Sequence, residues 1–171
     1  MRSLPFTLRA LMLGAALVAV STVAGAQMSV TAAVNPAIAI SSPAGLNFGS
    51  VTKPSVTDVA FNAATTGLIQ VVGAASAGVT VTFPLTVTFT GPGTAPVYSI
   101  LSTSVGTKTI PSGSCDRTGV TTVDVTGGSI SSNLGSGGIL CYAVGGRLTT
   151  IAGTSDGAFS GTLTITVTYG P

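Results

Sequence analysis

The sequence has no histidine, no tryptophan and no glutamate, and only 6% of its 171 residues are charged. Without histidine or glutamate, the chain cannot build a Ser-His-Asp triad, a Cys-His pair or a facial metal triad. We therefore expect neither an enzyme nor a bound metal or cofactor. Asp116 and Asp124 lie close in sequence, but solvated turns explain them more simply than a paired-carboxylate or calcium site.

Charge is scarce as well as balanced in the chain after residue 26. Its four basic and four acidic residues cancel, so the basic isoelectric point comes from the first residues and does not indicate nucleic-acid binding. A neutral surface of serine and threonine also offers little repulsion between copies, which permits self-association. The residues concerned are Lys53, Lys108, Arg117 and Arg147 against Asp58, Asp116, Asp124 and Asp156.

The first 26 residues have the layout of a secretory signal peptide. Arg2 and Arg9 give a basic start, residues 10–23 are uncharged and apolar, and residues 24–26 read Ala-Gly-Ala. The apolar run is shorter than the roughly 20 residues that a spanning helix needs. We therefore predict cleavage after Ala26, export to the periplasm, cell surface or medium, and a mature single domain over 27–171 without a transmembrane segment.

The last stretch, residues 158–169, carries the clearest structural pattern. Large apolar residues and hydroxyl residues alternate with a period of two, which places them on opposite faces of a strand. The apolar set is Phe159, Leu163, Ile165, Val167 and Tyr169. Such a strand needs an apolar partner layer.

The other segments repeat this character. Residues 79–90 alternate in the same way, although Pro84 predicts either two strands or one bent edge strand. Asp156-Gly157 predicts a hairpin of 146–151 against 159–169. Many short strands separated by turns predict an antiparallel β-sandwich. Further strands are expected over 27–40 (broken at Asn35-Pro36), 46–51, 56–61, 68–72, 97–101, 120–125 and 139–149, a loop or short edge strand over 106–111, a turn over 41–45 and a loop over 133–138.

Two cysteines, Cys115 and Cys141, remain in the predicted mature chain. In an exported protein an even number of cysteines favours a disulfide. Two free thiols or half of a metal site are the alternatives, and the metal site has almost no other ligands to draw on.

Three motifs carry a resemblance to a known family: Leu46-Asn47-Phe48-Gly49, residues 144–148 (Val-Gly-Gly-Arg-Leu) and the final strand from Gly157 to Tyr169. Together with the leader, they resemble the secreted bacterial domain-of-unknown-function family 4402. More distantly, the layout is similar to spore coat protein U and to chaperone–usher pilus subunits. These relatives imply an immunoglobulin-like, pilin-like sandwich, a structural role at the cell surface, and a pilus-type chaperone and usher as partners.

Two functional hypotheses follow. In the first, the segment Met28, Val30, Ala32 and Val34 of one subunit adds as a strand beside Phe159–Tyr169 of the next, giving a fimbria-like or coat-like assembly. The simpler interpretation, favoured because the segment is short and Pro36 follows closely, is that it forms the first strand of its own sandwich. In the second hypothesis, the domain is a monomeric ligand- or carbohydrate-binding module that uses loop-tip residues such as Tyr98, Asn133 and Tyr142.

Overall fold

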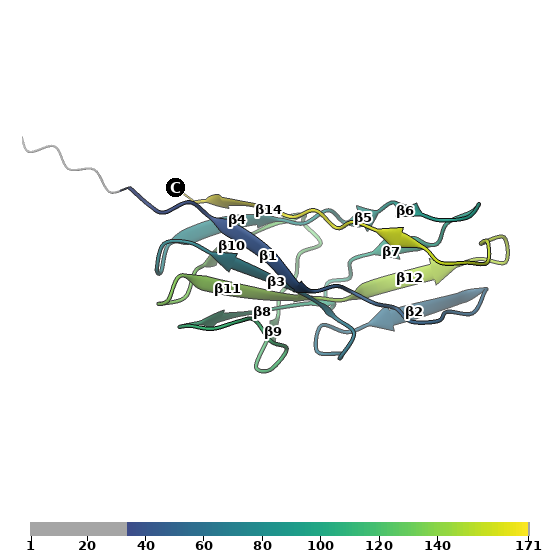
Figure 1. The fold of residues 1–171 in the computed structure, drawn as a ribbon, viewed down its shortest axis with the longest axis horizontal. Coiled ribbons are helices and arrows are strands. Elements are labelled where there is room, and N and C mark those ends of the chain that lie inside the picture. Colours follow the sequence, from purple (N-terminus) through teal and green to yellow (C-terminus); the bar gives the residue numbers. More distant parts are fainter. Residues whose placement is uncertain (1–33, 171) are drawn as a thin grey trace, which may run out of the picture. The chain divides into compact units, whose positions relative to one another are not determined.

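The computed structural model describes residues 34–170, and this part contains strands and loops but no helix (Figure 1). All its strand pairings are antiparallel. The predicted all-β antiparallel sandwich is therefore confirmed. The strands are β1 (Ala39–Ala44), β2 (Ser55–Val59), β3 (Gly67–Val72), β4 (Gly78–Thr82), β5 (Thr86–Val87), β6 (Phe89–Thr90), β7 (Val97–Ser99), β8 (Val105–Ile110), β9 (Thr121–Thr122), β10 (Ser129–Asn133), β11 (Ile139–Val144), β12 (Gly146–Thr150), β13 (Ser160–Gly161) and β14 (Thr166–Tyr169).

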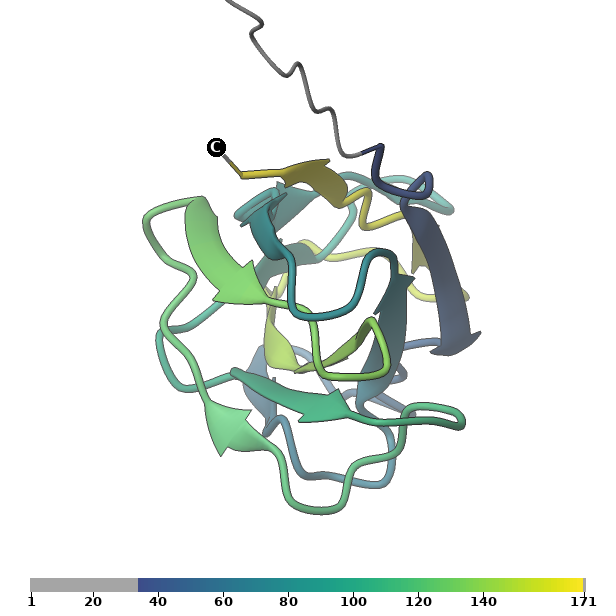
Figure 2. The ribbon, with the colours of Figure 1, turned by 90° about the vertical axis from the view of Figure 1, so that its left-hand side faces the viewer.

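The strands form four hydrogen-bonded sheets, in the orders β1-β3-β11-β8-β9, β10-β4-β14, β2-β12-β7-β5 and β13-β6. Long segments of the chain pass from one sheet to another. Residues 139–150 supply β11 and β12 on either side of Gly145, and residues 78–90 supply β4, β5 and β6. Figure 2 shows the strands arranged around the interior, so the sheets enclose a shared core.

The core is aliphatic with a few aromatic rings. The rings of Phe83 and Tyr142 meet edge to face, with centroids 5.2 Å apart. Burying each side chain of this size stabilises the fold by about 1.5–3 kcal/mol. The largest fully buried side chains include Val71, Val79, Val81, Phe83, Val105, Val125, Leu140, Tyr142 and Val144.

The alternation of the last stretch is confirmed, but its predicted partner is wrong. Phe159, Leu163 and Ile165 are partly buried, whereas the hydroxyl residues between them are exposed. The stretch does not form a hairpin with 146–151, because β12 pairs with β2 and β7 while β14 pairs with β4. The loop after β12 instead leads to β13, which pairs with β6 in a different sheet. In this loop the backbone N–H of Ser155 donates to the carbonyl of Thr94.

Some of the other local predictions are confirmed and others are wrong. The break of 79–90 around Pro84 is confirmed, as is a strand interrupted at Gly145. The predicted turn over 41–45 is wrong, because β1 continues to Ala44, and residues 46–51 form no regular strand.

Two strands of the central part, β8 and β10, also differ from the sequence-based prediction. The segment 106–111 is not an edge: β8 lies between β11 and β9 in the five-stranded sheet. The strand β10 was not predicted, since its Ser-Ile-Ser-Ser-Asn sequence offers a single large apolar residue to indicate it.

The predicted disulfide is present between Cys115 and Cys141. Cys141 is completely buried on β11, and Cys115 lies in the loop after β8, where its N–H donates to the side-chain oxygen of Gln70. The same Gln70 side chain donates through its amide to the carbonyl of Gly113. The bond thus ties this loop onto the central sheet.

We expect the Cys115→Ala/Cys141→Ala variant to lose about 3.5 kcal/mol of unfolding free energy, from the loop-closure entropy of a 26-residue separation. Urea unfolding with and without a reducing agent measures this loss. The reductant should destabilise only the natural chain. A reductant effect of equal size on the double variant would contradict the assignment.

No helix in the described part of the chain is long and apolar enough to cross a membrane. The predicted signal peptide lies outside the described residues, as do residues 27–33 of the predicted mature chain.

Candidate functional site

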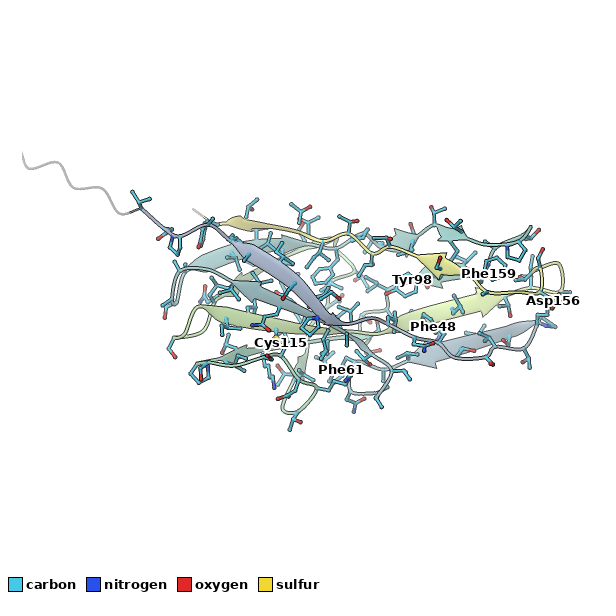
Figure 3. All side chains as sticks on the ribbon, viewed as in Figure 1. Phe48, Phe61, Tyr98, Cys115, Asp156 and Phe159 are labelled. Atoms are coloured by element: carbon cyan, nitrogen blue, oxygen red, sulfur yellow. A yellow bond between two sulfur atoms is a disulfide. The ribbon has the colours of Figure 1, made fainter. Side chains whose placement is uncertain are left out.

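A large groove opens along one side of the sandwich, with a volume of about 1390 Å³. One lip is formed by residues 40–53, which comprise β1 from Ile40 onward and the irregular segment that follows it. The other lip is formed by residues 154–165, which lead into β14. Figure 3 labels Phe48 and Phe159, one from each lip, and Tyr98 near them. Of the residues that the structure describes, Lys53 and Asp156 are the only charged ones that line the groove.

The floor of the groove is the outer layer of the core. It is made by Ile69, Val87, Phe89, Tyr98, Val144 and Leu148. The rings of Phe48 and Tyr98 pack edge to face at 6.0 Å. The Tyr98 hydroxyl donates to the carbonyl of Gly145 at 2.8 Å, and burial raises the pKa of Tyr98 well above its ordinary value. Tyr98 is therefore a neutral structural residue, and the floor offers apolar contact rather than reactive groups.

Both lips have free backbone edges. Among the described residues, β1 pairs only with β3, and β13, the strand within the second lip, pairs only with β6, so each lies at the edge of its sheet. Between β13 and β14, residues 162–165 make no backbone hydrogen bond to another described segment, and residues 45–51 make one, from the N–H of Asn47 to Thr65. Unpaired edges of this kind are templates for an additional strand.

The opening is bounded by polar contacts at its two ends. At the first end, the Tyr169 hydroxyl donates to the carbonyl of Pro36 at 2.7 Å and accepts from the N–H of Ala74 at 2.8 Å. At the second end, the Lys53 ammonium donates to the carbonyl of Thr154 at 2.6 Å and lies 3.0 Å from the Asp156 carboxylate. We call these the Tyr169 end and the Lys53 end.

The structure brings part of the predicted assembly strand to this site. Phe159, Leu163 and Ile165 line the groove. Val167 and Tyr169 instead pack against the core beyond the groove. Of the predicted donor residues, Val34 is 93% exposed, and Met28, Val30 and Ala32 lie outside the described residues.

The predicted loop-tip ligand site is wrong. Tyr98 is 2% exposed and Tyr142 is fully buried, with its hydroxyl 2.9 Å from that of Ser132. Only Asn133 is exposed, at the end of β10. The two tyrosines therefore pack in the core, with hydrogen-bonded hydroxyls, and present no ring to a sugar.

The acidic residues are held in local contacts. Asp116 accepts from the Lys108 ammonium and from the Thr118 N–H, and these bonds lower the pKa of its carboxyl. Asp124 accepts from the hydroxyl and N–H of Thr126, which lowers its pKa in the same way. Among residues 34–170 there is no group of three potential metal ligands.

Sequence reasoning missed the lip formed by residues 45–51. The sequence predicts an ordinary short strand over 46–51, and the side chains of Leu46, Phe48 and Val51 do pack against the core. Strand pairing depends on the three-dimensional fold. The sequence alone therefore does not show that residues 45–51 lack a paired neighbouring strand among the described residues.

Comparison with known proteins adds no relative: no protein-family model, no curated protein and no solved structure matches the chain.

Proposed function

We propose that this chain is an exported, non-catalytic structural subunit of the bacterial cell surface, with an immunoglobulin-like domain that assembles by β-strand addition. The observation that carries the proposal is the apolar groove between two unpaired strand edges. A strand placed in the groove could form backbone hydrogen bonds with both lips of the groove. Every second side chain of that strand would pack on the aliphatic floor.

The occupant we propose is residues 27–34 of a second copy. Its apolar residues Met28, Val30, Ala32 and Val34 have the strand period that the floor requires. Extended, these eight residues span about 27 Å, and the lip segment 158–165 has the same number of residues. Because the predicted mature chain carries no net charge, electrostatic repulsion between two copies is weak.

The geometry of the ends favours one direction of addition. Val34 lies two residues before Pro36, whose carbonyl accepts from the Tyr169 hydroxyl, so each copy's own first residues continue from the Tyr169 end. A donor domain therefore has room at the Lys53 end of the receiving copy. Its segment 27–34 then runs antiparallel to residues 158–169, and the copies follow one another head to tail. Such a contact does not close and gives fibres.

The test compares two adjacent substitutions in the donor segment. Val30→Asp would bury a carboxylate against the groove floor, which costs several kcal/mol, so we expect self-association of residues 27–171 to weaken about 100-fold or more. Thr31→Asp has the opposite parity and should change association less than about threefold. Sedimentation velocity measures both.

A natural mature chain that remains monomeric at high concentration would overturn the proposed function. Equal effects of the two substitutions would overturn the identity of the donor segment.

A further inference from the structure

Three of the large hydrophobic side chains that remain exposed lie together. Thr149 on β12 is opposite Val56 on β2 and Val97 on β7, so these two valines flank it on one face of the four-stranded sheet. Ile151 directly follows the end of β12, two residues beyond Thr149. Val56, Val97 and Ile151 are 58%, 62% and 57% exposed, and we call them the end patch.

The rest of this sheet face is polar. The next row is Asp58, Arg147 and Ser99, and Arg147 donates two hydrogen bonds to the Asp58 carboxylate, both of 2.7 Å. The outer face thus changes from charged to apolar over two residues of each strand. A cluster of branched aliphatic side chains beside a polar surface is typical of an interaction site rather than of scattered surface residues.

The end patch adjoins the Lys53 end of the groove. Val56 comes three residues after Lys53. The carbonyl of Ile151 accepts a hydrogen bond from the N–H of Thr154. The carbonyl of Thr154 in turn accepts from the Lys53 ammonium. In Figure 1 the turn after β12 and the C-terminal end of β14 lie at opposite sides of the described domain. The patch is therefore continuous with the end at which the donor domain arrives under the proposed function.

Other exposed hydrophobic side chains lie at the opposite end of the domain. Val34 is 93% exposed, and Val72, 36% exposed, pairs with Ala39 at the start of β1. Head-to-tail addition places the donor's Val34 where its segment leaves the receiver's groove, next to the receiver's end patch. Each copy thus carries one apolar surface at each end.

We propose that the end patch is a docking surface for the next copy of this chain, which it contacts around that copy's Val72 and the N-terminal end of its β1. This inference rests on the proposed function and adds a second contact to the inserted strand. The two contacts together fix the orientation of neighbouring copies, so the assembly is a stiff fibre rather than a chain of domains on flexible linkers. The contact is heterologous and leaves both terminal surfaces available for growth.

The test is the double substitution Val97→Lys/Ile151→Lys in the mature chain, with Leu85→Lys as a single-lysine control outside the patch. Leu85 is also exposed, at 42%, but it belongs neither to the patch nor to the groove lining. We expect the double variant to weaken association of the copies about tenfold or more, and Leu85→Lys to change it less than twofold. Sedimentation velocity at matched concentrations gives the constants.

A second measurement separates docking from strand uptake. A fluorescent peptide with the sequence of residues 27–34 is titrated into Val30→Asp chains, which still have an intact groove, with and without the two lysines. Equal peptide affinity with weaker association of the copies supports docking by the patch. Unchanged association, or equal losses in Leu85→Lys, overturns it while strand addition stands. Failure of the peptide to bind either chain overturns strand addition as well.

Discussion

Substituting Leu163 by Asp is expected to abolish acceptance of a strand while leaving the domain folded. Leu163 lies on the groove lip, is partly buried, and belongs to the stretch without backbone partners. In the isolated domain an aspartate here can remain hydrated at the open groove. When a strand covers the groove, the carboxylate loses this hydration, which costs several kcal/mol and lowers strand affinity about 100-fold or more.

A nearby residue outside the groove provides the control. Thr166 is exposed at the start of β14 and does not line the groove, so Thr166→Asp adds the same charge without placing it under the incoming strand. We expect less than about a threefold effect. Circular dichroism and urea unfolding establish that both variants are folded, and sedimentation velocity measures association. An equal loss in both variants would mean that net charge, rather than the groove, controls assembly.

Mixing strengthens the test. A Leu163→Asp chain can donate residues 27–34 but cannot accept them, whereas a Val30→Asp chain can accept but cannot donate. An equimolar mixture should therefore stop at heterodimers, although each variant alone is monomeric. Continued growth beyond dimers in the mixture would contradict the assignment of donor and acceptor.

The sequence predicted which face of each strand is buried far better than which strands are neighbours. The period-two pattern of residues 158–169 is a local property, and it correctly placed Phe159, Leu163 and Ile165 inward. The partner of that stretch depends on contacts far away in the chain. Asp156-Gly157 indicates a turn, but the Asp156 side chain pairs with Lys53 and the chain there crosses between layers.

The candidate site was half predictable for the same reason. The lip that contains Leu163 was recognised from its alternation, and the opposite lip was not recognised as unpaired. The predicted exposure of Tyr98 and Tyr142 was wrong because the sequence alone does not distinguish an exposed tyrosine from a core tyrosine whose hydroxyl is hydrogen-bonded. Tyr98 is the second kind, since its hydroxyl bonds the carbonyl of Gly145.

The other large effect is expected at Gly145, where the chain passes from β11 to β12. A Cβ atom at this position would lie 1.9 Å from the carbonyl oxygen of Val59, a backbone atom that cannot move aside as a side chain can. The N–H of Gly145 donates to the carbonyl of Ser104, and its own carbonyl accepts from Tyr98. The backbone is therefore held from several sides.

We expect Gly145→Ala to cost about 3 kcal/mol of unfolding free energy, the upper part of the range for overpacked sites. Gly153→Ala is the control, because the nearest atom to its added Cβ would be 3.9 Å away, on the Ile151 side chain. That variant should stay within about 0.5 kcal/mol of the natural chain in urea unfolding. Equal stability of the two variants would mean that β11 and β12 are not joined by the close backbone crossing. Because Val144, Leu148 and Tyr98 around the crossing form the groove floor, Gly145→Ala should also weaken binding of the 27–34 peptide, whereas Gly153→Ala should not.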